Sequence, residues 1–125
     1  MNISNFMVGE WVKVKTLHDS CPSECIRKLE LSDFMKDPYE YPQNDYEPVS
    51  ITPEILGKNG FVNTNYPDND YDINEHLHLI YCFGWSTDKY DVYYDKHSMG
   101  IYINYVHELQ RLLNIYKSNK QIEKV

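Results

Sequence analysis

The residues best suited to chemistry are the three cysteines and five histidines, because thiolates and imidazoles are preferred ligands of Zn²⁺. His18, Cys21 and Cys25 lie close together in the chain. Further candidates, which would share one face of a strand, are His76, His78 and Cys82. A structural zinc site needs four ligands, and no second paired motif accompanies the local set. Zinc binding is therefore an alternative, and free thiols beside Pro22 are the preferred interpretation.

A second segment resembles the first half of a calcium-binding loop. Asp68, Asp70 and Asp72 stand at its first, third and fifth positions. The glycine expected at the sixth position is replaced by Ile73, and the glutamate expected at the twelfth position is replaced by Leu79. The sequence therefore predicts a solvated acidic turn and not a calcium site.

No constellation of residues predicts catalysis. The cysteines, serines and histidines lie outside glycine-rich elbows and known nucleophile signatures, and the five glycines are scattered singly without a phosphate-binding Gly-Lys-Ser/Thr segment. We therefore assign no catalytic residue, no metal ligand and no cofactor, and we expect a protein that is not an enzyme.

The negative charge is concentrated in the middle of the chain. The whole chain has a formal net charge of −7, but residues 33–75 alone contribute −8. Because phosphate contacts require clustered lysine and arginine, direct nucleic-acid binding is disfavoured. The segment from Arg111 onward carries +3, so a small nucleic-acid-associated regulatory module that uses a C-terminal helix remains an alternative.

Two acidic segments, at about 32–50 and 63–74, combine carboxylates with tyrosine and proline. Tyrosine offers a large, rigid contact area, and carboxylates attract a cationic partner. We therefore predict a surface that binds a host or phage protein with a basic surface; the alternative is that these residues only keep long loops in solution. The candidate binding residues are Asp37, Tyr39, Glu40, Tyr41, Asp45, Tyr46, Glu47, Tyr66, Asp70, Tyr71 and Asp72.

The periodicity of apolar residues predicts the elements that position these groups. Alternation favours strands at 7–15, 26–31 and 75–85, and a hairpin of 89–94 with 101–103 around a turn at 97–100. Thr52 and Pro53 predict a short helix that ends near Gly60. Asn104 is the expected cap of a C-terminal helix whose apolar stripe comprises Val106, Leu109, Leu112, Leu113 and Tyr116.

Together these elements indicate an α+β fold: a small antiparallel sheet of about four to five strands, one short helix and a packed C-terminal helix. We expect a single domain over residues 1–125, with long acidic loops at 32–50 and 63–74 and a tail that frays after residue 118. No apolar run approaches the length of a membrane span, and Met1–Asn5 does not resemble a signal peptide. We therefore expect a cytoplasmic protein without a membrane partner. The oligomeric state is not predicted.

Three segments resemble a group of small proteins from gut-type bacteria and their phages. They are Val8-Gly9-Glu10-Trp11-Val12, Glu47 to Leu56 followed by Asn59-Gly60-Phe61, and Gly100 to Gln110. The corresponding blocks of the group read hGNhV, PIPLTEEhLxxxGF and YIKYVHQLQNL. This chain departs from them at Asn104, where lysine is usual, and at Glu108, where glutamine is usual.

The resemblance covers roughly a third of the chain, in order, and implies a shared fold and a phage or mobile-element origin. The group has no established activity, so the resemblance transfers no site residue. With the acidic segments, it leads to the hypothesis of a non-enzymatic interaction protein in the cytoplasm of a bacterial host, in its sharpest form an inhibitor of a host defence or nucleic-acid-processing complex.

Overall fold

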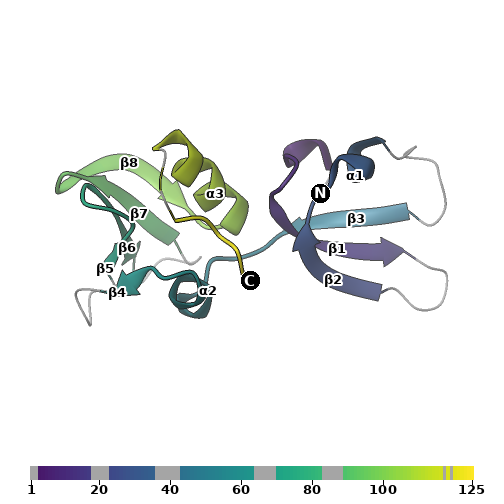
Figure 1. The fold of residues 1–125 in the computed structure, drawn as a ribbon, viewed down its shortest axis with the longest axis horizontal. Coiled ribbons are helices and arrows are strands. Elements are labelled where there is room, and N and C mark those ends of the chain that lie inside the picture. Colours follow the sequence, from purple (N-terminus) through teal and green to yellow (C-terminus); the bar gives the residue numbers. More distant parts are fainter. Residues whose placement is uncertain are drawn as a thin grey trace. The chain divides into compact units, whose positions relative to one another are not determined.

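The computed structural model describes residues 3–17, 23–35, 43–63, 70–82, 89–116, 118 and 120–125. The chain forms two compact units, Met1–Val49 and Ser50–Val125, where the sequence led us to expect a single domain. Each unit contains its own antiparallel sheet (Figure 1). The predicted α+β class is confirmed, with two sheets in place of one.

The first unit is a three-stranded sheet with two short helical segments. Its elements are the 3-10 turn η1 (Ile3–Asn5), β1 (Trp11–Leu17), β2 (Ser23–Lys28), α1 (Leu31–Met35) and β3 (Gln43–Pro48). β1 lies in the middle of the sheet, between β2 and β3 (Figure 1). The core contains Phe6, Val12, Val14, Leu29 and Tyr46.

The first strand begins at Trp11, later than the predicted start at residue 7. Gly9 has a φ of +88°, and its N–H donates to the carbonyl of Leu29, so the backbone turns there before pairing begins. Val8 precedes this turn and is exposed, whereas Val12 and Val14 are buried as the alternation predicts. The turn therefore removes Val8 from the strand pattern.

The acidic segment 32–50, which we expected to be loop, contains most of α1 and all of β3. β3 pairs with β1 so that Tyr46 lies opposite Val14, and Tyr46 is only 6% exposed. Pro48 falls at the end of this edge strand, where no ladder donor is needed. A single buried tyrosine thus anchors a strand that hydrophobic alternation did not reveal.

The second unit is a five-stranded antiparallel sheet with two helices. Its elements are α2 (Pro53–Lys58), β4 (Val62–Asn63), β5 (Asp70–Asp72), β6 (Leu77–Cys82), β7 (Lys89–Tyr94), β8 (His97–Ile103) and α3 (Val106–Ile115). The strands follow one another in sequence order across the sheet, so β6, which lies within the predicted strand 75–85, is the central strand. The predicted loop 63–74 therefore contains part of β4 and all of β5.

Both ends of α2 follow the sequence signals. Oγ1 of Thr52 accepts a hydrogen bond of 3.2 Å from the N–H of Ile55, and Pro53 occupies the first turn. Gly60 adopts a φ of +81°, which allows the N–H of Phe61 to return to the carbonyl of Leu56. The prediction for this helix is confirmed.

The hairpin of β7 and β8 turns two residues earlier than predicted. Asp95 and Lys96 have positive φ values of 48° and 69°. Two-residue hairpin turns adopt this conformation because its twist matches the right-handed twist of the two flanking strands. His97 then pairs with Tyr94, and the predicted turn residues 97–100 belong to β8. A shift in register between Asp91 and Tyr93 accommodates the extra residues of β8, including Gly100.

Helix α3 lies along one face of the second sheet, beside β7 and β8 (Figure 1). Its predicted apolar positions Leu109, Leu112 and Leu113 are all buried. The cap is Tyr105 and not Asn104; Oε1 of Glu108 accepts 3.0 Å hydrogen bonds from the N–H groups of both residues. The carboxylate of Glu108 thereby accepts hydrogen bonds from two backbone N–H groups that have no carbonyl partner within the helix.

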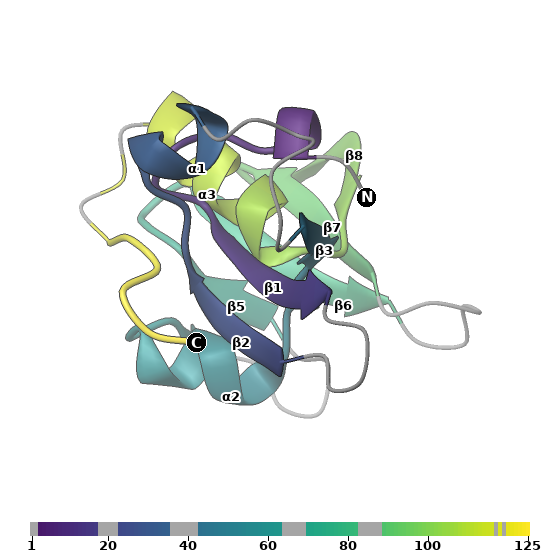
Figure 2. The same cartoon turned by 90° about the vertical axis from the view of Figure 1, so that its right-hand side faces the viewer.

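The tail after residue 118, which we expected to fray, returns to α2 (Figures 1 and 2). Oδ1 of Asn59 accepts from the N–H of Glu123 at 2.7 Å, and Nδ2 of Asn59 donates to the carbonyl of Lys124 at 2.7 Å. Ile122 is 1% exposed. The side-chain amide of Asn59 therefore holds the tail by hydrogen bonds to its backbone, and burial of Ile122 adds an apolar contact.

Within the described residues, no helix has the length and apolar character that crossing a bilayer requires.

Candidate functional site

The register of the second sheet separates its side chains into two faces. Tyr71, Leu79 and Val92 lie opposite one another on β5, β6 and β7 and are buried. The residues between them point to the other face. We call this the acidic face and define it by the side chains of Asp70, Asp72, His78, Ile80, Cys82, Lys89, Asp91, Tyr93, Ser98 and Tyr102. It holds three carboxylates and one lysine.

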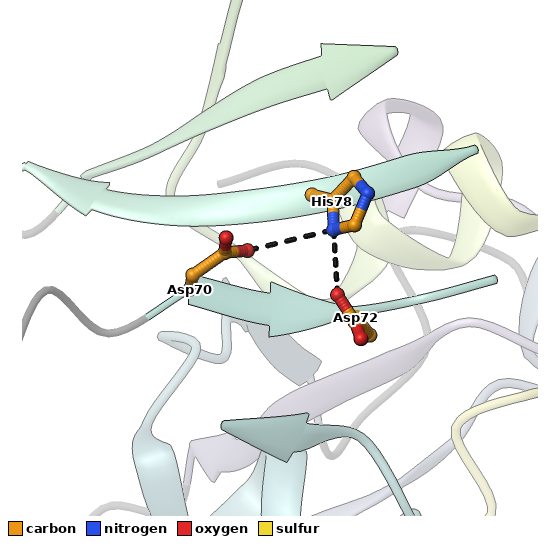
Figure 3. A group of neighbouring side chains, drawn as sticks. All are labelled: Asp70, Asp72 and His78. Carbon is orange, nitrogen blue, oxygen red and sulfur yellow. Dashed lines mark ion pairs between the residues drawn. The ribbon is translucent and has the colours of Figure 1, made fainter. Parts of the chain in front are cut away.

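Three of these side chains converge on one point (Figure 3). Asp72 lies directly opposite His78, and Asp70 is two residues away on the same strand. Nδ1 of His78 is 2.6 Å from Oδ1 of Asp72 and 3.5 Å from Oδ1 of Asp70. All three residues are half-buried, and their possible ligand atoms lie within 4.8 Å of one another. We call this group the Asp70/Asp72/His78 cluster.

The electrostatics of the cluster favour an added positive charge. Burial raises the pKa of Asp70 above its ordinary value, the carboxylate of Asp72 raises this pKa further, and His78 opposes the shift. A raised carboxyl pKa means that the folded protein resists ionisation of Asp70, so this group contributes less stability as the pH rises above its usual pKa. A cation bound beside it would relieve that cost.

The third carboxylate of the acidic face belongs to Asp91, which is 8% exposed. Oγ of Ser98 donates to its two oxygens, at 3.0 and 3.2 Å. Burial raises the pKa of the neighbouring Cys82 thiol, and the charge of Asp91 raises it further. A thiol held in its protonated form is a poor nucleophile, so the acidic face offers binding groups more than reactive ones.

Four of the six zinc candidates, namely Cys25, His76, His78 and Cys82, lie within the described residues. His76 lies ahead of β6, where its Nδ1 contacts Oδ1 of Asp95 at 2.5 Å and its ring lies beside Tyr94. This carboxylate contact raises the pKa of His76. His78 and Cys82 share the acidic face, and Cys25 is exposed on β2 of the other unit. His18 and Cys21 lie outside the described residues.

Five of the predicted partner-binding residues also lie outside the described residues: Asp37, Tyr39, Glu40, Tyr41 and Tyr66. Tyr46 and Tyr71 are only 6% and 5% exposed, so their rings belong to the cores and form no part of a binding surface. Asp70 and Asp72 lie on the acidic face. Of the predicted acidic turn, Asp70 and Asp72 lie in strand β5 and not in a turn, and Asp68 lies outside the described residues.

Asp45 and Glu47 of β3 face lysines and not an open acidic surface. The register places Asp45 opposite Lys15 and Glu47 opposite Lys13, and Lys13 also approaches Glu24 of β2. Such cross-strand pairs balance each other's charge. On this face of the first sheet three carboxylates accompany three lysines, namely Glu24, Asp45 and Glu47 with Lys13, Lys15 and Lys28.

Sequence reasoning missed several members of the acidic face: Asp91, Tyr93, Ser98 and Tyr102. Their link to Asp70 and Asp72 depends on the pairing of β5 through β8, which composition does not show. A local signal did exist for the turn between β5 and β6. The side chain of Asn74 accepts from the N–H groups of His76 and Leu77, as asparagine commonly does in turns. If this turn is recognised in the sequence, the strands on either side of it can be paired, and Asp72 then lies opposite His78.

The basic residues near the C-terminus serve the fold in part. Nζ of Lys120 donates to the carbonyl of Gly60 at 2.8 Å and lies over the ring of Phe61. Lys124 is tied to Asn59 through its backbone. Because Lys120 supports the end of α2, it is a poor candidate for a phosphate contact.

Comparison with protein-family models, with curated proteins and with solved structures found no match for this chain.

Proposed function

We propose that the protein is a non-enzymatic interaction protein that binds a basic segment of a partner protein at the acidic face. One observation supports this most: strand register places the half-buried carboxylates of Asp70 and Asp72 on the same face as the buried Asp91, and among the described residues of that face the one lysine or arginine is Lys89. A surface with more carboxylates than cationic groups attracts cationic partners and speeds their association.

The aromatic residues of the acidic face suit the same role. Tyr93 is half-buried and Tyr102 is 42% exposed, so both offer ring surface beside Asp91. Tyrosine is enriched in binding sites because its ring is large and rigid and its hydroxyl can form hydrogen bonds. Lysine and arginine side chains of a partner would find both carboxylates and ring faces here.

The resemblance to small proteins of bacteria and their phages supports a sharper form of the proposal. In this form the chain is of phage or mobile-element origin and acts in the cytoplasm of a bacterial host, where it inhibits a defence or nucleic-acid-processing complex. Its acidic face would occupy a basic site that otherwise receives nucleic acid. Phosphate groups and carboxylates present similar negative charge to arginine and lysine, which is the physical basis of this competition.

A peptide titration tests the proposal. The probe is an oligolysine peptide, with an oligoglutamate peptide of equal length as its control, and binding is measured by calorimetry at low salt. The variant Asp70→Asn/Asp72→Asn should weaken oligolysine binding by about tenfold, because two carboxylates leave the face. Added salt should weaken binding to the wild-type protein.

The matched control is Asp45→Asn/Glu47→Gln, which removes two carboxylates that lie opposite Lys15 and Lys13. Binding to this variant should stay within about twofold of the wild type, because each lost charge was already compensated. Equal losses in both variants would refute the acidic face as the binding surface. So would oligoglutamate binding as tight as oligolysine binding.

A further inference from the structure

The Asp70/Asp72/His78 cluster has the dimensions of a metal-binding site. Two donor atoms that each lie ~2.1 Å from a metal ion are ~3.0 Å apart at a right angle and ~3.4 Å apart at a tetrahedral angle. Nδ1 of His78 and Oδ1 of Asp70 are 3.5 Å apart, close to the tetrahedral value. Oδ1 of Asp72 lies 2.6 Å from the same nitrogen, so its carboxylate would move away by ~0.4 Å to reach the right-angle separation and by ~0.8 Å to reach the tetrahedral one.

The environment of His78 points independently to a ligand. Its Nδ1 is shielded from solvent and, within the described residues, makes no hydrogen bond despite the nearby carboxylates. Figure 3 shows this nitrogen facing the gap between Asp70 and Asp72. A buried polar atom without a hydrogen bond is costly, and a metal ion in that gap would satisfy its lone pair.

A simple ion pair between strands explains the cluster less well. An imidazolium opposite Asp72 would need only one carboxylate and would donate a directed hydrogen bond to it. The second carboxylate, of Asp70, is half-buried on the same face at 24% side-chain exposure. Two carboxylates and one imidazole that converge from adjacent strands match the donor set of a divalent ion.

We propose that Asp70, Asp72 and His78 bind a divalent transition-metal ion, such as Zn²⁺ or Mn²⁺, on the acidic face. The imidazole ligand favours these ions over Ca²⁺ and Mg²⁺, which take oxygen ligands. Three protein ligands leave at least one coordination position for water or for a group from a partner. A bound divalent ion would offset the charges of Asp70 and Asp72, so the peptide titration is carried out on metal-free protein and the two tests fail independently.

Calorimetric titration of the full chain, without an affinity tag, tests the site with ZnCl₂, MnCl₂ and CaCl₂. The wild-type protein should bind one equivalent of Zn²⁺ or Mn²⁺, and its melting temperature should rise with the ion, because a ligand bound only to the folded state stabilises it. His78→Gln and Asp72→Asn should each weaken Zn²⁺ binding by at least about tenfold. Thermal melts without metal show whether each variant folds.

His76→Gln is the matched control, because His76 also contacts a carboxylate, that of Asp95, but lies outside the cluster. It should retain Zn²⁺ affinity. Mn²⁺ should broaden the amide NMR signals of β5 and β6 before others, a readout that holds even if one variant fails to fold. The proposal is overturned if the wild-type protein binds neither Zn²⁺ nor Mn²⁺, if His76→Gln abolishes binding, or if Ca²⁺ binds as tightly and His78→Gln has no effect.

Discussion

Two histidines two residues apart occupy different environments. His78 faces two carboxylates across strands β5 and β6, whereas His76 is exposed and contacts the carboxylate of Asp95 in the turn after β7. The sequence singled out both as zinc candidates because it showed their type and spacing. It did not show which carboxylates would face them, because those partners come from other strands.

The contact between His76 and Asp95 predicts a pH dependence. The hydrogen bond to Asp95, aided by its charge, raises the pKa of His76 above the ordinary value of 6.5. This pair therefore stabilises the fold below pH 6.5, and its contribution is lost as the pH rises through the raised pKa. In an NMR titration, Asp95→Asn should return the pKa of His76 toward 6.5. An unchanged His76 pKa in this variant would contradict the contact.

At the scale of elements, strong local signals predicted structure well. Thr52, Pro53 and Gly60 defined the ends of α2, and the apolar spacing of α3 identified its buried face. β3 and β5 were missed for a common physical reason. Each presents only one buried tyrosine, Tyr46 or Tyr71, between polar neighbours, and each is held by backbone pairing with a strand elsewhere in its unit.

Helix α3 supplies a large share of the buried surface of the second unit, so truncation there should be costly. Leu109 is 0% exposed, and Leu109→Ala should lower the free energy of unfolding by about 2–5 kcal/mol. Asn114→Ala on the exposed side of the same helix is the control and should change it by less than about 0.5 kcal/mol. Denaturant titration measures both. A loss as small as that of the control would mean that α3 is not docked on the sheet.

At the scale of the whole molecule, the charge of the middle segment divides between the two units. The carboxylates of β3 meet lysines of β1, which lie far from them in the sequence, and the carboxylates of β5 join Asp91 on the acidic face. Composition predicted that an acidic surface exists. It did not predict where, because long-range pairing decides which charges are compensated.

The tail after residue 118 also belongs to the second unit. Ile122 is 1% exposed, so Ile122→Ala should lower the free energy of unfolding by about 2–5 kcal/mol. Lys124→Ala is the control, since the exposed Lys124 contacts Asn59 through its backbone N–H and carbonyl, which survive the substitution. If both variants unfold at the wild-type denaturant concentration, the tail does not contribute to the fold.

We propose the acidic face as the binding surface of the protein. Mapping amide NMR shifts while oligolysine is added tests it most directly. We predict that the largest shifts fall on β5, β6 and β7, around Asp70, His78 and Asp91, and that they shrink as salt is added. Shifts centred instead on β3, around Asp45 and Glu47, or spread evenly over the chain would contradict the account.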